Sequence, residues 1–296
     1  MNWLIIQSDG EHKGQDGWCP NWHFRECYAI QHALQANGQS AVVWGKRHAG
    51  FEQVPDFSSY DFIFNIENYE FEWIPELKKY PHQTRIQWVI DAHCQTIENY
   101  APTLRNTDVV LQSTRRYVDY YSSQFPGQKH LYFPNGVDSR YFDKSLYGLT
   151  VKKREMGLIF IGGLPPGRKY RIEHMQRYCG LLYSYPVTGM DYVRALLDAK
   201  IQFNSPVYGD INYRNFETIG MGTCLLTQYD EELENLGFKH EENCLFYHTL
   251  GEAEDLSRTY LANDKWCSVA DAGYEFSKQH TYIKRIGDLI KTLKTL

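Results

Sequence analysis

Short apolar runs alternate with longer polar or amphipathic stretches along the first half of the chain. Each run enters a polar segment that can begin a helix, and the runs cover residues 3–7, 41–44, 62–65, 86–90 and 109–111. A helix is predicted over residues 22–36, and it ends at an Asn-Gly pair. Strands separated by helical segments predict a parallel sheet with helices on both faces.

The pattern restarts at residues 156–161, which read Met-Gly-Leu-Ile-Phe-Ile. It continues with predicted helices over 168–178 and 192–199 and predicted strands over 200–204 and 224–226. The last predicted helix, over 282–295, places four apolar side chains on one face: Ile283, Ile286, Ile290 and Leu293. A chain of 296 residues has room for two domains of about 150 residues, so the restart predicts a boundary between residues 138 and 155.

The segment 204–223 places an arginine and a glutamate three residues apart, on one face of a predicted helix. Arg214 offers five donors to diphosphate oxygens, and Glu217 offers an acceptor pair for the two hydroxyls of a ribose. The loop before this helix lets backbone N–H groups approach an anion, and it contains Tyr208, Gly209, Asp210 and Asn212. The same residues also fit an ordinary capped helix with an ion pair, so this segment alone does not distinguish a nucleotide-binding site from such a helix.

A second basic cluster follows the strand predicted over residues 156–161. Gly162 and Gly163 come first, and Arg168, Lys169 and Arg171 follow on the next helix. Residues 151–200 hold nine basic and four acidic side chains, an excess placed where a diphosphate would need it. The alternative is a solvated basic face of a helix.

Motifs in both clusters resemble glycosyltransferases with the two-domain B-type (GT-B) fold. The matching segments are the strand ending in Asn-Ser-Pro, the Gly-Asp-Ile-Asn loop, and Arg-x-Phe-Glu before Leu-Leu-Thr. Residues 133–138, 160–163, 272–273 and 280–281 are similar to other parts of such enzymes. The resemblance is closest to the spore-maturation-protein-like group and fainter to phage DNA beta-glucosyltransferases. It is good over about residues 130–290 and thin before them.

This resemblance implies an α/β fold of two Rossmann-like domains facing a central cleft. Residues 1–148 would bind the acceptor and residues 149–281 the donor, with the helix 282–296 crossing back to the first domain. The implied reaction moves a hexose or pentose from a nucleoside diphosphate sugar, with UDP as the expected nucleotide, to an acceptor hydroxyl. The donor is a co-substrate, and no further cofactor is expected. The chain has no Asp-x-Asp motif, which agrees with metal-independent chemistry.

The donor roles follow from the same resemblance. Arg168, Lys169 and Arg214 would neutralise the diphosphate that leaves the sugar. Backbone groups around Met190, after Thr188 at a predicted strand end, would contact the base.

Candidate acceptor-side residues lie in loops that follow strands, where ligands of such folds bind. Asp91 follows the run 86–90 and is our preferred general base for an inverting reaction, although it also suits a helix N-cap. His93 either contacts the donor phosphate or is an exposed helix residue. In the loop 8–22, Asp9, Gly10 and Trp18 are candidates for acceptor binding, and Trp18 equally suits a staple of this loop to the core.

The cysteine pattern and the lengths of the apolar runs indicate the cellular compartment of the protein. Seven scattered cysteines form no Cys-x-x-Cys pair, a pattern typical of reduced intracellular proteins and unlike a zinc site. The opening apolar run is too short for a signal peptide, and no run approaches the ~20 apolar residues of a membrane span. We therefore expect a soluble, cytoplasmic protein.

Two other classes of function remain open. One is a DNA glucosyltransferase acting on a hydroxymethylated base, with modified DNA as the acceptor. Residues 1–150 hold 13 basic and 17 acidic side chains, and this negative charge counts against DNA binding, which depends on phosphate neutralisation. The other is a non-catalytic module that binds a nucleotide or sugar. The sequence does not determine the sugar, the acceptor, the stereochemical outcome or the oligomeric state.

Overall fold

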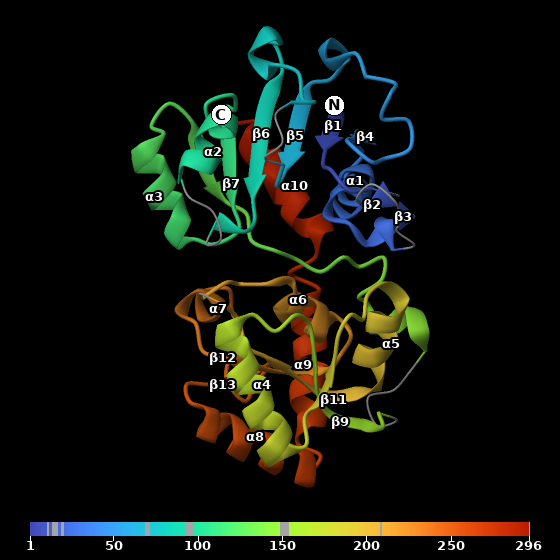
Figure 1. The fold of residues 1–296 in the computed structure, drawn as a ribbon, viewed down its shortest axis with the longest axis vertical. Helices are drawn as coiled ribbons and strands as arrows, with labels where there is room; N and C mark the ends of the chain where they lie inside the picture. The colour runs from blue at the N-terminus through green and yellow to red at the C-terminus, as the bar shows by residue number, and fades with distance from the viewer. Residues whose placement is uncertain are drawn as a thin grey trace. The chain divides into compact units, whose positions relative to one another are not determined.

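The structure is a computed structural model that describes residues 1–10, 12–13, 17–18, 21–68, 72–92, 97–148, 154–207 and 209–295. Its contacts divide the chain into two compact units (Figure 1). The first unit is Met1–Asn135 with Tyr282–Leu296, and the second is Gly136–Thr281. The predicted boundary at residue 148 thus falls inside the second unit.

The first unit is built on a six-stranded parallel sheet in the order β4-β1-β5-β6-β7-β8. The strands are β1 (Asn2–Ile6), β4 (Ser40–Trp44), β5 (Phe62–Ile66), β6 (Thr84–Val89), β7 (Val109–Gln112) and β8 (Lys129–Tyr132). The apolar runs of β1, β5, β6 and β7 are buried, as expected for a parallel sheet covered on both faces, whereas the edge strands β4 and β8 are partly exposed. A separate two-stranded ladder joins β2 (His12–Lys13) and β3 (Gly17–Trp18).

One face of this sheet packs against α1 (Glu26–Ala36) and α10 (Tyr282–Leu293), which also pack against each other. Trp88 on β6 meets the Tyr282 ring at 5.9 Å between centroids, and Asn37 Nδ2 donates to Ile283 O at 2.9 Å. These contacts hold the last helix on the first unit, as predicted. The helix predicted over 22–36 is split into η1 (Trp22–Phe24) and α1, because Arg25 between them is extended.

The opposite face carries two apolar clusters. The first gathers side chains of β1, β4 and β5 with η2 (Phe57–Ser59) and η3 (Leu77–Lys79). The second gathers side chains of β6 and β7 with α2 (Ile97–Leu104) and α3 (Arg116–Gln124). Asn65 and Gln87 lie opposite each other on β5 and β6, on this same face. Polar side chains therefore occupy part of a face that is otherwise apolar.

The second unit has a five-stranded parallel sheet in the order β10-β9-β11-β12-β13. The strands are β9 (Met156–Ile161), β10 (Leu182–Ser184), β11 (Ala199–Asn204), β12 (Cys224–Gln228) and β13 (Leu245–Tyr247). The helices are α4 (Pro166–Cys179), α5 (Gly189–Asp198), α6 (Tyr213–Gly220), α7 (Glu231–Asn235), α8 (Leu250–Ala262) and α9 (Trp266–Ser277). Phe160, Phe203 and Trp266 lie in its buried core.

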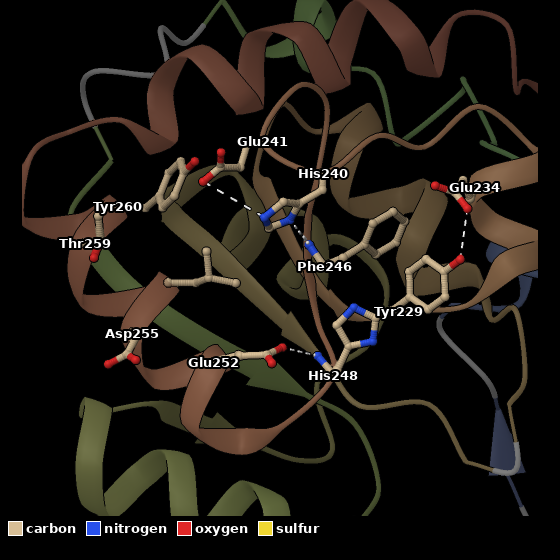
Figure 2. A pocket seen from close by; sticks show the side chains of 11 residues that line it. Tyr229, Glu234, His240, Glu241, Phe246, His248, Glu252, Asp255, Thr259 and Tyr260 are labelled. Atoms are coloured by element: carbon tan, nitrogen blue, oxygen red, sulfur yellow. Dashed lines mark hydrogen bonds and ion pairs between the residues drawn. The ribbon is translucent and has the colours of Figure 1, made fainter.

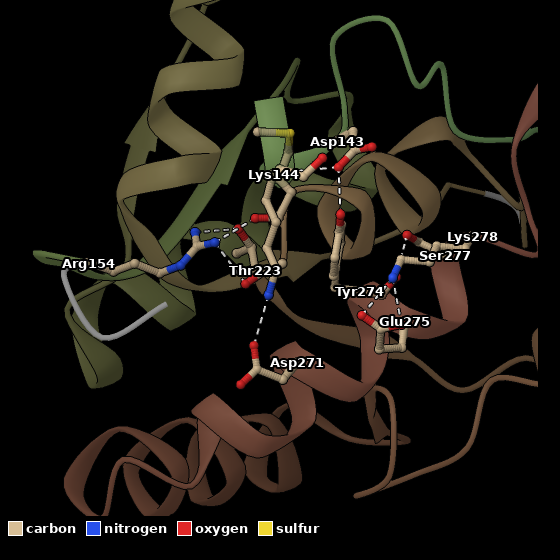
Figure 3. A network of polar contacts seen from close by, with 12 residues as sticks. Asp143, Lys144, Arg154, Thr223, Asp271, Tyr274, Glu275, Ser277 and Lys278 are labelled. Atoms are coloured by element: carbon tan, nitrogen blue, oxygen red, sulfur yellow. Dashed lines mark hydrogen bonds and ion pairs between the residues drawn. The ribbon is translucent and has the colours of Figure 1, made fainter. Parts of the chain in front are cut away.

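The segment 136–148, which includes η5 (Lys144–Tyr147), belongs to the second unit because its side chains and backbone are anchored there. Val137 N donates to His280 O at 2.8 Å. Tyr274 donates to Asp143 Oδ1 at 2.7 Å, and Lys144 Nζ lies 2.8 Å from Asp271 Oδ1 (Figure 3). These contacts explain why the division of the chain comes earlier than the hydrophobic pattern predicts.

A buried arginine ties the ends of several elements of the second unit together (Figure 3). The Arg154 guanidinium donates to the carbonyl oxygens of Leu196, Ala199, Met221 and Gly222 and to Thr223 Oγ1. These carbonyls lie in the last turn of α5 or just after α5 and α6, so Arg154 supplies partners that helix C-termini lack. Burial lowers the pKa of Arg154 to about 10.

No helix in the described part of the chain combines the length and the apolar character needed to cross a membrane. Five cysteines of that part are free thiols: Cys27, Cys179, Cys224, Cys244 and Cys267.

Candidate functional site

Two arginines converge at the carboxyl edge of the second sheet, where β9 and β11 end. Arg168 lies in the first turn of α4, just after the loop that contains Gly162 and Gly163. Arg214 lies in the first turn of α6. The sequence predicted both residues as donor-binding, and the fold brings them together from helices 46 residues apart in the chain.

Backbone carbonyls hold the Arg168 guanidinium in place. Its Nε donates to Ser205 O at 2.7 Å, and its Nη1 donates to Gly163 O at 3.0 Å. One contact lies just past the end of β11 and the other in the glycine loop. The side chain therefore bridges the two segments that a bound anion would touch.

Arg214 is oriented by the ends of the same two strands. Its Nε donates to Ile161 O at 3.1 Å, and its Nη1 donates to Asn204 Oδ1 at 3.0 Å. The remaining nitrogen, Nη2, points at Gly162, where an added Cβ would lie only 2.7 Å away. Gly162 also has φ +149°, so glycine is required here both for conformation and for the approach of the guanidinium.

Neither guanidinium forms an ion pair with a carboxylate of the described residues, and the acceptors of both are neutral. Burial lowers the pKa of Arg168 to about 10, and the Arg214 cation acts in the same direction, while Asp210 opposes them. Both guanidinium carbons lie over the Phe160 ring, at 5.6 and 5.1 Å from its centroid. The site is thus a pair of like charges with little compensation, which is the environment that attracts a dianion.

The position of Arg214 depends on a buried amide network that the sequence analysis did not predict. Asn204 donates from Nδ2 to Asn215 Oδ1 at 2.8 Å and to Thr227 Oγ1 at 3.2 Å. These bonds fix its amide so that Oδ1 faces Arg214 and also accepts from Asn212 at 3.3 Å. The only sequence signal was an asparagine that ends an apolar strand.

Arg171 and Lys169, which were also predicted to bind the donor, have different surroundings from Arg168 and Arg214. Arg171 is part-buried, and its Nη1 donates to Gln228 Oε1 at 2.5 Å and to Ser205 Oγ at 3.4 Å. Lys169 is exposed, with its Nζ 3.7 Å from Glu173 one turn along α4. Arg171 therefore joins the site through a residue it shares with Arg168, whereas Lys169 lies on the solvent face.

Glu217 lies one turn after Arg214 on α6, as predicted. Its Oε2 accepts from the Tyr192 hydroxyl at 3.0 Å. Desolvation and the Glu217 carboxylate raise the pKa of Tyr192 well above its usual value, so this hydroxyl remains a donor. Met190 lies in the first turn of α5 beside Tyr192. The prediction that Thr188 ends a strand was wrong, because β10 ends at residue 184 and Thr188 is the N-cap residue of α5.

The loop between β11 and α6 is partly described. Gly209 has φ +69°, and Asp210 N donates to Val207 O at 3.1 Å. Asn212 is the N-cap residue of α6. Tyr208, predicted to bind the donor, lies outside the described residues.

Asp91, the candidate base, is exposed directly after β6. Its backbone N–H donates to Glu67 Oε1 at 2.9 Å, and Ile90 N donates to the same oxygen. Glu67 has φ +44°, so an unusual backbone conformation directs its side chain to the end of the next strand. The described helix α2 begins only at residue 97, and His93 lies outside the described residues.

In the loop that follows β1, the predicted acceptor-binding residue Asp9 already has an ion-pair partner. Asp9 forms an ion pair with Arg47, and its N–H donates to Lys46 O at 3.0 Å. A Cβ on Gly10 would lie 2.3 Å from His48 Nδ1, so glycine is needed for close packing. Trp18 belongs to β3, and its side chain lies outside the described part of the structure.

A cavity of about 510 Å³ lies elsewhere in the second unit, along β13 and α8. Figure 2 shows Tyr229, His240 and Glu241 among its side chains, together with His248 and Glu252. No residue predicted to bind the donor lines it. Within the described ranges, no three His, Cys, Asp or Glu side chains are grouped so that they could hold a metal ion.

The family model described as "Glycosyl transferase-like" matches residues 159–291. This match begins in β9 and includes the glycine loop, Arg168, Arg214 and Glu217. No curated protein is significantly similar to the chain in sequence.

Several solved structures share the fold at low sequence identity. Sucrose-phosphate synthase from Thermosynechococcus elongatus is 13% identical, with a TM-score of 0.62 and 99% of each chain covered. Anabaena Alr3699/HepE in complex with UDP and glucose is 11% identical, with a TM-score of 0.68 and 100% of each chain covered. An alpha-glucosyltransferase in complex with UDP-glucose and DNA containing an abasic site is 12% identical, with a TM-score of 0.69, covering 98% of this chain and 99% of that one. The prediction of a GT-B fold is confirmed.

Proposed function

We propose that this protein is a glycosyltransferase that moves a sugar from a UDP-sugar to an acceptor hydroxyl. The observation that carries the proposal is the pair of guanidinium groups, Arg168 and Arg214, held by neutral partners beside Gly162 and Gly163. A diphosphate supplies the negative charge that this pair lacks. The match of residues 159–291 to the glycosyl transferase-like family and the UDP complexes of proteins with this fold support the same assignment.

In the proposed reaction, the acceptor oxygen forms a bond to the anomeric carbon of the sugar. The bond from that carbon to the β-phosphate oxygen breaks, and UDP leaves with the electron pair. Arg168 and Arg214 stabilise the charge that develops on the leaving diphosphate. We propose that no metal ion is required, so turnover should be unchanged by EDTA.

The other donor contacts are assigned by chemistry. Glu217 binds the two ribose hydroxyls, and the Tyr192 hydroxyl keeps its carboxylate in position. Backbone groups near Met190 contact the base. Arg171 and Lys169 add positive charge around the diphosphate.

On the acceptor side we propose that Asp91 accepts the proton of the attacking hydroxyl, as an inverting reaction requires. The bonds from the backbone at residues 90 and 91 to Glu67 support this role, because they fix the chain that carries the carboxylate. Asp9, Gly10, Trp18 and His93 remain candidates for acceptor binding.

The test is a calorimetric titration with UDP, ADP and GDP, followed by donor hydrolysis assays with UDP-linked hexoses and pentoses. We expect UDP to bind with the highest affinity and at least one UDP-sugar to be hydrolysed slowly without an acceptor. Failure of every nucleoside diphosphate to bind would rule out the proposal.

A second candidate acceptor is a hydroxymethylated base in DNA. It is favoured by one observation, the shared fold with an alpha-glucosyltransferase in complex with DNA. Binding to such DNA should weaken steeply with salt if this candidate is correct. Salt-independent or absent binding would leave an acceptor other than nucleic acid.

A further inference from the structure

A cavity of about 300 Å³ lies in the first unit, on the face of the sheet that carries two separate apolar clusters. Leu77, which lines it, belongs to the cluster of β1, β4 and β5. Thr103, on the other wall, lies next to Leu104 of the cluster around α2. The cavity is therefore the gap left where these two clusters do not meet.

The polar side chain of Asn65 lines this gap, and it is only 2% exposed. Gln87 Nε2 donates to Trp88 O at 3.1 Å, which fixes the orientation of the Gln87 amide. Its Oε1 then accepts from Asn65 Nδ2 at 2.6 Å. Asn65 Oδ1 is left without a hydrogen-bond partner among the described residues.

Thr103, which also lines the cavity, carries a second buried oxygen. It is 4% exposed, and its Oγ1 has no partner in the part of the chain that the structure describes. A buried polar atom without a partner is costly, so native proteins satisfy it with water or a ligand. Two such oxygens in one cavity indicate that a hydrogen-bond donor enters it.

The other lining residues are partly apolar and partly polar, and the polar ones are Glu76, Asn106 and Thr107. Ile74, Pro75 and Leu77 form one side, and Pro102 lies on the other. Proline rings lose little freedom when a ligand binds, which favours a preformed site. The volume is at the lower end of the range for small-molecule sites. Among the described residues no Lys or Arg lines the cavity and Glu76 does, so a phosphate or other anion is not the ligand that it suits.

We propose that this cavity binds a small aromatic or alicyclic compound that carries a single hydroxyl or N–H group and donates it to Asn65 Oδ1. The apolar side chains contact the ring, and Thr103 Oγ1 accepts or donates a second hydrogen bond. This site is separate from the proposed donor site and does not depend on the proposed function.

The test uses phenol as the probe and benzene as its matched partner without a donor, with binding to the intact protein measured by ligand-observed NMR. Phenol should bind saturably and about 2- to 10-fold more tightly than benzene, the effect of one net hydrogen bond. In crystals soaked with phenol, its oxygen should lie within hydrogen-bond distance of Asn65 Oδ1.

Two variants fill the cavity from residues that line it, Thr103→Phe on α2 and Asn106→Phe just after this helix. Arg105→Phe, an exposed position between them, is the matched control. Both filling variants should lose phenol binding while the control retains it, and thermal unfolding identifies any variant that does not fold. The inference is overturned if the wild-type protein shows no saturable binding, if benzene binds as tightly as phenol, or if a folded filling variant binds phenol normally.

Discussion

Replacing Arg214 by alanine removes one of the two charges on which the proposed donor site depends. Two of its nitrogens are occupied by Ile161 O and Asn204 Oδ1, so Nη2 provides the donors that face the glycine loop. Each hydrogen bond between charged groups contributes about 1.5–3 kcal/mol. Loss of one such bond therefore weakens UDP binding about 10- to 150-fold.

The substitution also removes two internal hydrogen bonds, so its effect on folding must be separated from its effect on binding. Asn204 Oδ1 keeps the bond from Asn212, and Ile161 O loses a donor. We expect a loss of about 1–2 kcal/mol in the free energy of unfolding, which leaves the variant folded. Arg214→Lys keeps the charge without the planar fork and should give an intermediate affinity.

The assay is a calorimetric titration of UDP into each variant at constant salt. The matched control is Arg177→Ala, which removes an exposed arginine from α4 and should leave the affinity within about 2-fold of the wild type. A folded Arg214→Ala protein that binds UDP with wild-type affinity would refute the assignment of the diphosphate site.

Four other outcomes are expected. Gly162→Ala should lower the free energy of unfolding by about 1–3 kcal/mol in chemical denaturation. The backbone of Gly162 has φ +149°, and the new Cβ would lie 2.7 Å from Arg214 Nη2. Gly163→Ala is the matched control, because its Cβ would meet open space and the free energy of unfolding should not change. Glu217→Ala should weaken UDP binding about 10-fold but leave binding of 2′,3′-dideoxy-UDP unchanged, and equal losses for both nucleotides would exclude a ribose contact. Asp91→Asn should lower turnover about 100-fold or more with unaltered UDP affinity, and full activity would remove this residue from the mechanism. Arg154→Met should lower the free energy of unfolding by about 3–5 kcal/mol because four carbonyl oxygens lose a donor, and a loss below about 1 kcal/mol would contradict the capping role.

The fold could be predicted from the sequence because both sheets are parallel and buried. Such strands are continuous apolar runs, and the runs of β1, β5, β6, β7 and β9 are visible without any structure. The strands that were not predicted are short. β8 is only half-buried and β10 is mostly exposed, so neither forms a distinct apolar run. β13 is buried but only three residues long, and it was not predicted either.

The candidate donor site was inferred from residue types rather than geometry. Glycines after a strand and arginines at helix starts are a local signal, and the structure brings Arg168 and Arg214 together. The sequence could not separate Arg168 from Lys169, which follows it directly. Successive residues on a helix point about 100° apart, so Lys169 faces solvent beside Glu173.

The residues that orient the site could not be predicted, because their roles depend on contacts between distant segments. Asn204 positions Arg214 only because Asn215 and Thr227 fix its amide from another helix and another strand. Glu67 reaches the backbone at Asp91 only because β5 and β6 are neighbours in the sheet. Neither relation follows from spacing in the sequence.

The central claim is that the pair of Arg168 and Arg214 binds the diphosphate of a nucleotide sugar. A crystal structure of the protein with UDP tests this claim most directly. We predict diphosphate oxygens within hydrogen-bond distance of both guanidinium groups, above the loop at Gly162 and Gly163. A diphosphate bound away from both arginines would contradict the account.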